Sequence, residues 1–595
     1  MPAIKIMGFD GLVPRMSATM LSDNQAQVAN NVKLYSQELR FWRGPTAQTA
    51  TMVANTKSIF KYYAAAADPY WLVWASDDID VVASPTTDLT DYRLYYTGDG
   101  VPKKTNESLV STGSGAYPRG WLNMGVPAPT GAPTVSASGG SGTAENRAYV
   151  YTYVSTFGSI KEESAPSPAA TVSVLPGGTV TVNAFTTAPT TNYNITHRRI
   201  YRSVTGATTD SYQFVAEIPI GTTSYADSLT AAQLGEVLGT IGWTPPPSTL
   251  RGLIALPGGA LAGFDGNTVY FSEPFYPHAW PVKYALNVPS KIVGLGVFGT
   301  SIAVMTDRYP YIINGGIPGA MSVERVPSLE PCLTKRSIIS NEAGVMYASP
   351  NGLMQIGPNS VGIQTGALFR RDEWQAYSPS YIFAVSYDNK YFALYSDAVT
   401  SSSSFILSGD DIPALSKISL RATGAHIDSR NGYLYYVGTD NVIYQADADD
   451  LNPLLYTWKS KRFVLPQATS FSALKLDGDF DQADLVAAYN AEIAAIKTAN
   501  QAIFGTALNG ALNTTAVNFY DVNGSKLKNI PPPAMVREAQ VLIYGDGTLQ
   551  TTLSVSTFDP VRIPPFKSRT VELQISGNIS VRSVAVATTV MELHQ

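Results

Sequence analysis

The sequence is poor in the residues that form cross-links and bind metals. Its 595 residues include a single cysteine, Cys332, and four histidines. A lone cysteine cannot form an internal disulfide, and such usage is typical of a protein that folds in a reducing cytosol. So few histidine and cysteine side chains leave almost no ligand set for a structural zinc ion.

Charged residues and long apolar runs are also scarce. Charged residues make up 15% of the chain, against about a quarter in ordinary globular proteins. The net charge is −5 without any basic block. This argues against a protein that grips nucleic acid through its phosphates, but not against one past which DNA slides. No run approaches the ~20 apolar residues of a membrane helix, and the N-terminal stretch has no signal-peptide core. We therefore expect no membrane span.

Residues of turns and short strands are abundant instead. The chain contains 48 glycines, 39 prolines and 34 tyrosines, a composition that favours many short strands joined by turns. At this length the chain is expected to hold more than one domain. We therefore predict a mainly β protein with several domains.

Residues 1–126 are expected to form an N-terminal segment and the first blade of a β-propeller. Ser22 followed by Gln25 fits a capping box, which predicts a short helix with Ala26 facing inward. After it, NVKLY and LRFW flank SQE as a tight hairpin. From Lys57 onward, four strand-like runs follow in about fifty residues, and four antiparallel strands make one blade.

The same rhythm of short strands returns in residues 247–458. Hairpin-like pairs of runs occur in GALAGFDGNTVYFSEP, SIAVMTDRYPYIING, GVMYASPNGLMQIG, FAVSYDNKYFALYS and GYLYYVGTDNVIYQAD. They recur about every forty to fifty residues, which is the usual length of a propeller blade. We interpret this segment as about five further blades of an irregular β-propeller.

Residues 127–246 separate the first predicted blade from the others. Proline- and glycine-rich stretches bound this segment, GVPAPTGAPTVSASGGSGT before it and TPPPSTLRG after it. About six to seven strands are expected within roughly 110 residues, a count that suits an immunoglobulin-like sandwich without its disulfide. Its YVYTYVST and RRIYRS runs resemble a fibronectin type III module. The linkers predict an inserted, separable module with limited contact to the blades.

Residues 459–595 are expected to form a β-rich platform region that carries one long helix over 481–504. Apolar residues at helical spacing predict this helix. They are Leu485, Tyr489, Ile493, Ile496 and Ile503. The first turn is acidic, which is favourable at a helix N-terminus, and Gly505 stands where a C-terminal cap is expected.

No catalytic pattern stands out in the chain. The run DGDFDQADL begins like a calcium-binding EF-hand loop, but Gln482 and Ala488 replace the glycine and glutamate that such a loop needs. Asp372 and Glu373 are adjacent, and adjacent side chains on a strand point to opposite faces, which argues against a glycosidase carboxylate pair. The Gly-x-Ser-x-Gly, His-Glu-x-x-His and phosphate-loop motifs are absent from the sequence. We predict no enzyme, no cofactor and no metal site.

Four long stretches carry a family resemblance. They are GLVPRMSATMLSDNQAQVANNVKLYSQELRFWRGP, YPRGWLNMGVPAP, LRGLIALPGGALAGFDGNTVYFSEPFYPHAWP and SGNISVRSVAVATTVMEL. They are similar to the tail nozzle, or tail tubular protein B, family of short-tailed bacteriophages (podoviruses). The chain departs from that family at Ser22, where proline is usual, and at Gln37, where glycine is frequent. The segment 479–529 matches nothing in the family.

The resemblance implies a structural virion protein that forms a homo-hexameric tail nozzle. In that family the ring is attached below the head-to-tail adaptor or portal, is associated with tail fibres or tailspikes, and encloses the channel for genome ejection. Double-stranded DNA would pass through without tight binding. The chain would fold in the host cytoplasm and reside in the virion tail. The alternative is a tail-associated host-surface or glycan-binding protein.

Asp479, Asp481 and Asp484 are candidate channel-facing residues. An acidic or neutral wall favours passage of DNA, because each phosphate neutralised by lysine or arginine strengthens binding. An ordinary solvated helix start explains the same residues, so both interpretations stand at this point.

Overall fold

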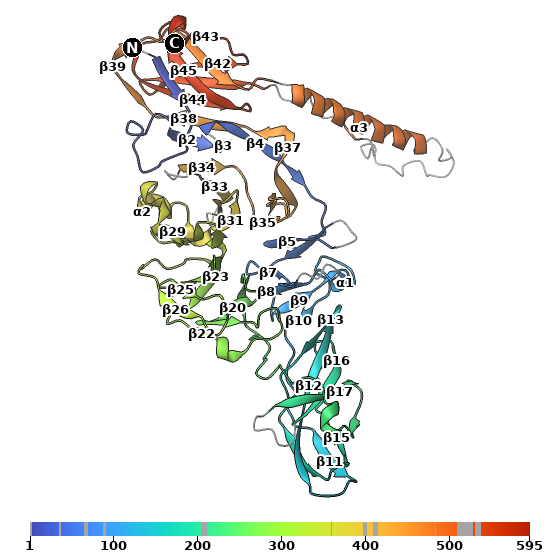
Figure 1. Cartoon of the computed structure of the whole chain (residues 1–595). Helices are drawn as coiled ribbons and strands as arrows, with labels where there is room; N and C mark the ends of the chain where they lie inside the picture. Colours follow the sequence, from blue (N-terminus) through green and yellow to red (C-terminus); the bar gives the residue numbers. More distant parts are fainter. Residues whose placement is uncertain are drawn as a thin grey trace.

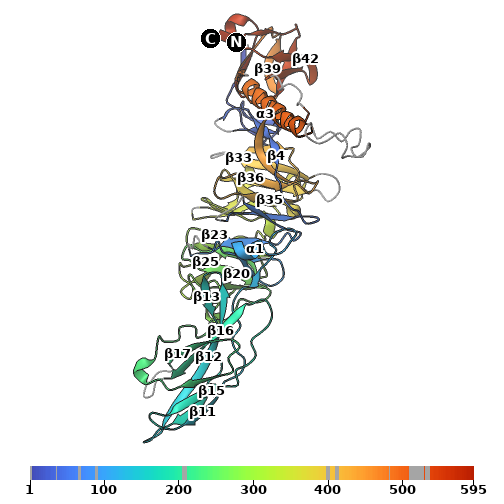
Figure 2. The same ribbon diagram turned by 90° about the vertical axis from the view of Figure 1, so that its right-hand side faces the viewer.

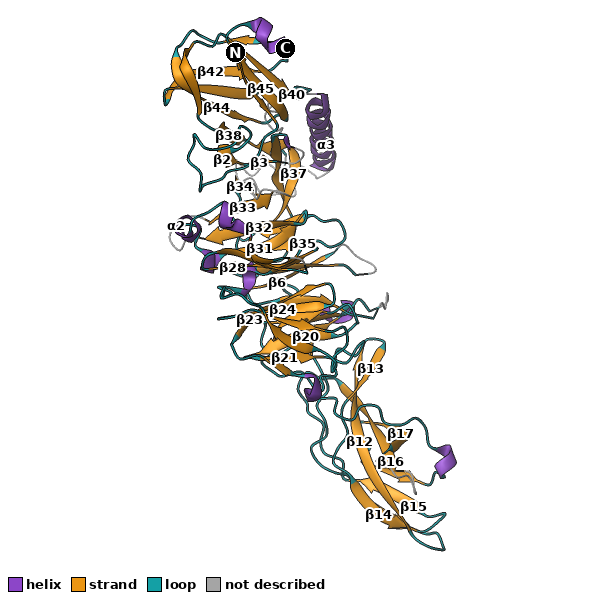
Figure 3. Cartoon of the chain, turned by 60° about the vertical axis from the view of Figure 1, so that its left-hand side comes forward, coloured by secondary structure: helices purple, strands orange, loops and turns teal. Residues whose placement is uncertain are grey.

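The structure is a computed structural model of the 595-residue chain. It describes residues 3–34, 37–64, 69–86, 91–203, 211–358, 360–396, 402–408, 414–481, 483–507, 528–529 and 537–594. Along these residues, strands run from β1 (Ala3–Met7) to β45 (Val581–Ala587), with three α-helices among them. The predicted mainly β class is confirmed, as Figure 3 shows.

The molecule is elongated and has three parts in succession (Figure 1, Figure 2). A β-platform at one end holds both chain termini, small sheets fill the middle, and the inserted sandwich forms the other end. Helix α3 (Ala483–Ala507) projects sideways from the platform.

Both ends of the chain build the platform. β1 pairs antiparallel with β45, which also pairs with β40 (Ala473–Gly478). A second sheet passes through β38 (Tyr456–Ser460), β44 (Ser568–Gly577) and β41 (Ala539–Gly545). The N-terminal strand is therefore part of the same layer as the C-terminal region.

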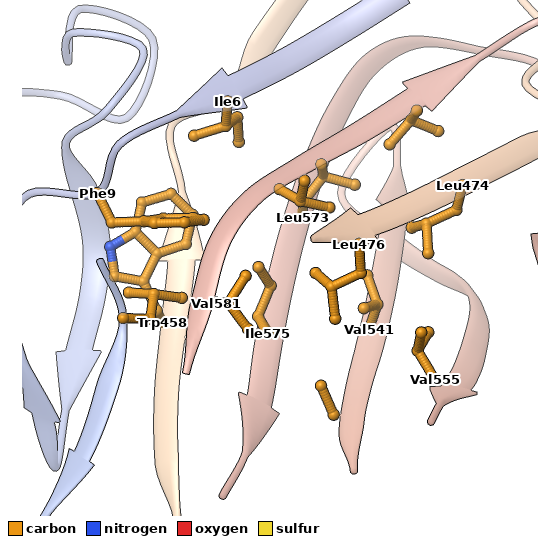
Figure 4. Close-up of a cluster of buried hydrophobic side chains, with 14 of the residues drawn as sticks. Ile6, Phe9, Trp458, Leu474, Leu476, Val541, Val555, Leu573, Ile575 and Val581 are labelled. Atoms are coloured by element: carbon orange, nitrogen blue, oxygen red, sulfur yellow. The ribbon is translucent and has the colours of Figure 1, made fainter. Parts of the chain in front are cut away.

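An apolar core holds the N-terminal stretch in the platform (Figure 4). The rings of Phe9 and Trp458 meet edge to face with centroids 4.9 Å apart. The Trp458 indole donates a hydrogen bond to the Asp10 carbonyl at 2.9 Å. Burying a large apolar side chain contributes about 1.5–3 kcal/mol, so these contacts stabilise the two chain ends together.

The first part of the predicted N-terminal element is a strand, not a helix. The Ser22 amide donates to Gln25 Oε1 at 3.0 Å, so the predicted turn is present, but β2 (Ala26–Asn30) follows it. β2 pairs antiparallel with β38, with Ala26 opposite Ser460. The pairing with β38 provides partners for the backbone N–H and C=O groups of this segment, and Ala26 is buried in the platform core. These contacts with residues distant in sequence outweigh the local capping signal, so the segment is a strand.

The predicted hairpin after β2 is present. β3 (Val32–Lys33) pairs antiparallel with β4 (Arg40–Ala47). Gln37, between them, adopts a φ of +60°, in the left-handed region that favours glycine. This backbone conformation explains why glycine would suit the position.

Seven groups of strands fill the middle of the molecule, and the group that begins with β31 continues into the ten-stranded sheet of the platform. Their first strands contact one another in succession, and β5 and β7 share an apolar cluster, so the series returns to its start. We call this arrangement the strand ring. It consists of β5 (Ser58–Tyr62), β7 (Asp80–Ala83), β19 (Arg251–Ala255), β23 (Ile292–Phe298), β27 (Ile339–Asn341), β31 (Phe383–Tyr387) and β35 (Gly424–Ile427). A β-propeller is our interpretation of the strand ring.

The four strand runs that follow Lys57 lie in two sheets. β5 pairs with β6 (Tyr70–Trp74) in a two-stranded sheet. β7 pairs with β8 (Leu94–Thr97) in a sheet completed by β9 (Lys103–Thr105) and β10 (Leu122–Asn123). The prediction that these four runs form one blade is wrong, because spacing along a chain indicates strands but not their partners.

The inserted segment consists of two sheets with a shared core. One sheet contains β11 (Thr134–Ser138), β15 (Thr179–Asn183) and β18 (Ser224–Asp227). The other contains β13 (Ile160–Glu163), β12 (Glu145–Phe157), β16 (Ile195–Ser203) and β17 (Tyr212–Pro219). Tyr149 and Tyr151 of β12 pack in one cluster with Val180 and Val182 of β15. All described members of this cluster lie in residues 127–246, except for Val126 directly before them.

Helix α3 begins later than predicted and extends further. It spans Ala483–Ala507, against the predicted 481–504, and Gly505 lies inside it. The Asp479 amide donates to the Ser580 carbonyl at 2.8 Å, and the Asp481 amide donates to Asp479 Oδ1 at 3.2 Å. These bonds hold the preceding segment in a turn against the platform, so the helix starts after it.

Candidate functional surfaces

The acidic residues before α3 lie at the surface beside the platform. Asp479 and Asp481 are both exposed, and the Asp481 carbonyl accepts a hydrogen bond from the Arg537 guanidinium. Asp484 is in the first turn of α3, and its side chain lies outside the described residues. The structure therefore brings together two of the three candidate residues, next to an arginine.

Helix α3 is only partly covered: Tyr489, Ile493 and Ile496 on its apolar face are half-buried. None of its described side chains is buried, and Val486 is 51% exposed. The Asn500 amide group both donates to and accepts from the Lys528 backbone at 2.9 Å. With 25 residues, the helix is about 37 Å long at ~1.5 Å per residue. Most helices in proteins are stabilised by packing of an apolar face, and α3 buries little of its own for a helix of this length.

A buried contact joins the sandwich to the sheets of the strand ring. Lys104 on β9 and Glu162 on β13 form an ion pair in which both side chains are 0% exposed. The Lys104 ammonium also lies 4.9 Å from the centroid of the Phe157 ring, and Phe157 packs in a cluster with Leu250 and other residues of the adjoining sheets. The prediction of limited contact is wrong here, because the tip of the β12–β13 hairpin packs between those sheets.

The electrostatics of this junction depend on burial. Burial alone would raise the pKa of the Glu162 carboxyl, but Lys104 and, more weakly, His278 bring the pKa below its usual value. His278 Nδ1 lies 4.0 Å from Glu162 Oε1. Burial lowers the pKa of His278 to about 4, so the imidazole is neutral at pH 7. The Lys104–Glu162 ion pair of this junction therefore lies in a medium of low dielectric constant, beside the apolar cluster around Phe157.

A cavity opens at the centre of the strand ring. Its inner part has a volume of about 410 Å³ and is lined by residues at or near the starts of β5, β7, β27, β31 and β35. A wider mouth of about 960 Å³ adjoins it. Lys57, Asp77, Arg336 and Phe383 line both parts. Concave sites of this size with a few polar groups are typical of ligand binding.

Two titratable side chains of the inner cavity, Lys335 and His426, carry no unpaired charge. Lys335 donates to Asp78 Oδ1 at 2.7 Å and also pairs with Asp80. The His426 ring lies 4.9 Å from the Phe60 ring, and burial lowers the pKa of His426 to about 4. Lys335 is thus neutralised by its own carboxylates, and His426 is uncharged at pH 7.

The other residues considered for chemistry have structural roles. The Cys332 thiol is buried and donates to the Thr334 carbonyl at 3.4 Å, and burial raises its pKa to about 12, which makes it unreactive. Glu373 lies in helix α2 (Arg371–Gln375), not on a strand as expected, and pairs with Arg370 at 2.9 Å. Within the described ranges, no group of three or more His, Cys, Asp or Glu is placed to hold a metal ion.

No helix in the described part of the chain is both long and apolar enough to cross a membrane. No family model matches the chain, and no curated protein matches it. Among solved structures, 76 chains match. One is the extracellular domain of a one-component system from B. thetaiotaomicron, at 13% sequence identity and a TM-score of 0.22. The match covers 51% of this chain and 40% of that one, and a TM-score this low does not indicate a shared fold.

Proposed function

We propose that the chain is a structural virion protein that forms the hexameric tail nozzle of a short-tailed bacteriophage. Six copies would surround the channel for genome ejection, below the adaptor or portal ring and in contact with tail fibres or tailspikes. The protein would fold in the host cytoplasm and reside in the virion tail.

The observation that carries this proposal is the projecting helix α3. It extends about 37 Å at ~1.5 Å per residue, with no buried side chain among those described, from a platform that both chain ends hold together. A second copy related by rotation would cover the helix, and repetition of that operation closes a ring. This arrangement supports an assembly subunit over a monomer that acts alone.

The positions of the family-like stretches support the same proposal. One supplies β2, β3 and β4, which join the platform to the strand-ring sheets. Another supplies β19, β20 (Leu261–Asp265) and β21 (Thr268–Phe271), and a third supplies β45. These strands build sheets in separate parts of the molecule, which is the distribution expected of a structural protein.

The charge of the chain suits a conduit for DNA. Six copies at −5 each give a formal charge of −30 for the ring. Exposed Asp479 and Asp481 would add to an acidic wall if the base of α3 faces the channel. Such a wall repels phosphates and limits friction during ejection, because binding strength grows with each phosphate contact.

Reconstitution with the cognate adaptor ring tests the proposal. The purified chain is mixed with adaptor rings, and the mass of the complex is measured by native mass spectrometry and its shape by electron microscopy. We expect six copies of this chain per ring around a central channel. A complex whose stoichiometry is incompatible with six, or a label on this chain found at the fibre tips of virions, contradicts the proposal.

A further inference from the structure

The cavity at the centre of the strand ring contains a fixed guanidinium. Arg336 Nη2 donates to the carbonyls of Lys57 at 3.0 Å and Thr423 at 3.2 Å. The guanidinium lies over the Phe383 ring, 4.3 Å from its centroid. Three neighbours therefore fix its position, while its remaining N–H groups make no bond to the residues that the structure describes. Arg336 lines both the inner cavity and its mouth.

Arg336 lacks the carboxylate that its neighbours have. No carboxylate oxygen of a described residue lies within 4.0 Å of its guanidinium. Lys335 is paired with two aspartates, and Lys57 lies 3.8 Å from Asp77. Arg336 is thus the one of these three cations with no carboxylate in direct contact, and Asp77 acts on it only over a longer distance. A partly desolvated guanidinium with unbonded N–H groups gains from a carboxylate in direct contact, because arginine binds planar carboxylates through paired N–H groups.

The mouth of the cavity adds an aromatic ring and several polar side chains. Tyr381 lines it and is 60% exposed. Asn55, Ser380 and Thr439 also line it, and none makes a side-chain hydrogen bond to another residue within the described ranges. An exposed aromatic face suits the apolar face of a sugar ring, and amide and hydroxyl groups suit its hydroxyls. Sites of about 300–1,000 Å³ accept ligands of this size.

We propose that the strand-ring cavity binds a saccharide that carries a carboxylate, such as a uronic acid residue of an acidic polysaccharide. The carboxylate lies against the free edge of the Arg336 guanidinium. The sugar ring stacks on Tyr381, and Asn55, Ser380 and Thr439 bond its hydroxyls. Binding alone is proposed, and it does not depend on the hexameric nozzle.

Calorimetry on the full chain tests this site with a galacturonic acid trimer, a neutral galactose trimer and inorganic phosphate at ~0.15 M salt. We expect the acidic trimer to bind at least about tenfold more tightly than the neutral one, since a hydrogen bond to a charged group is worth roughly tenfold or more. Arg336→Gln and Tyr381→Ala should each weaken binding about tenfold or more. Tyr381 is exposed, so Tyr381→Ala should not lower the stability of the chain. It therefore still tests the site if Arg336→Gln destabilises the fold.

Two substitutions serve as matched controls. Arg308 is exposed, and its side chain makes no bond to a described residue, while Tyr433 is 50% exposed; neither lines the cavity. Arg308→Gln and Tyr433→Ala should leave binding unchanged. The proposal is overturned if the wild-type chain binds neither trimer, if it binds both equally, if phosphate displaces the acidic trimer at equal concentration, or if the control variants weaken binding as much as the cavity variants.

Discussion

Lys104 and Glu162 form an ion pair from which solvent is excluded, although one belongs to the strand-ring sheets and the other to the inserted sandwich. The pair therefore links the orientation of the sandwich to the sheets beside it. Removal of one partner leaves an uncompensated buried charge, whereas replacement of both by apolar groups of similar volume is often nearly neutral.

The first prediction follows from this pair. Glu162→Gln should lower the free energy of unfolding by about 3–5 kcal/mol, and the double variant Lys104→Met, Glu162→Leu should recover most of that loss. Urea unfolding followed by tryptophan fluorescence measures both. Lys161→Met is the control, because Lys161 is 46% exposed and pairs with Glu217 at the surface, where a pair contributes less than about 1 kcal/mol. Equal effects of Glu162→Gln and Lys161→Met would contradict the role of the buried pair.

The second prediction concerns the sandwich alone. A fragment of residues 127–246 should melt cooperatively, because the cluster of Tyr149, Tyr151 and Val180 is internal to it. In the fragment Glu162 loses Lys104 and is no longer covered by the neighbouring sheets. Glu162→Gln should therefore cost less than about 1 kcal/mol in the fragment and several times more in the full chain. Dispersed NMR spectra and thermal melts provide the measurement, and a disordered fragment would show that the boundaries are wrong.

The third prediction is a loss of stability in mild acid. Burial lowers the folded-state pKa of His278 to about 4 from the usual 6.5. As the pH falls below 6.5 the unfolded chain takes up a proton that the folded chain refuses until about pH 4, so the free energy of unfolding decreases across this window. His426 acts in the same direction. Glu162 acts at lower pH: its folded pKa lies below its usual 4.5, so its contribution is present above that value and is lost as the pH falls through the folded pKa.

Urea unfolding at about pH 7 and about pH 5 tests this dependence, since the histidines of the unfolded chain, with a pKa of about 6.5, take up their protons between these two values. The wild-type chain should be less stable at the lower pH. His278→Gln should reduce the difference between the two conditions. An unchanged difference would mean that His278 is protonated in the folded chain.

The fourth prediction tests the exposed face of α3. Val486 is 51% exposed, so Val486→Glu should leave the melting temperature of the isolated chain unchanged. If a neighbouring copy covers the helix, the buried carboxylate should reduce the yield of six-copy complexes with the adaptor by about tenfold or more. Val237→Glu is the control, since Val237 is 57% exposed and forms a β-bridge with Gln213 of the sandwich, which lies at the opposite end of the molecule from α3 (Figure 1). Normal assembly of Val486→Glu would exclude this face from the subunit contact.

The fifth prediction concerns DNA and rests on the proposed nozzle. The isolated chain should bind double-stranded DNA weakly at ~0.15 M salt, with a dissociation constant of about 10⁻⁴ M or higher, at or beyond the weak limit of the non-specific range. Converting Asp479 and Asp481 together to lysine should tighten binding and steepen its salt dependence, because two phosphate contacts become available. Fluorescence anisotropy across a salt series measures both effects. Submicromolar, steeply salt-dependent binding by the wild-type chain would point to a protein that grips DNA.

Several features of this protein were predictable from the sequence because they depend on neighbouring residues. Asp388 and Asn389 form the turn between β31 and β32 (Lys390–Ser396), both with positive φ, as expected of a two-residue hairpin loop. The long helix follows from apolar residues at helical spacing, and α3 differs from the prediction only at its ends. Composition was sufficient for the mainly β class.

Only the tertiary structure decided which distant segments meet. Ala26 lies on a strand and not on a helix because it pairs with Ser460, a partner that no local pattern reveals. The same holds for Lys104 and Glu162, and for Arg336, whose lack of a carboxylate becomes visible only when the sheets surround it. The physical reason is that hairpins and helices are stabilised by bonds between residues close in sequence, whereas sheet partners, buried ion pairs and cavities arise from contacts that close long loops.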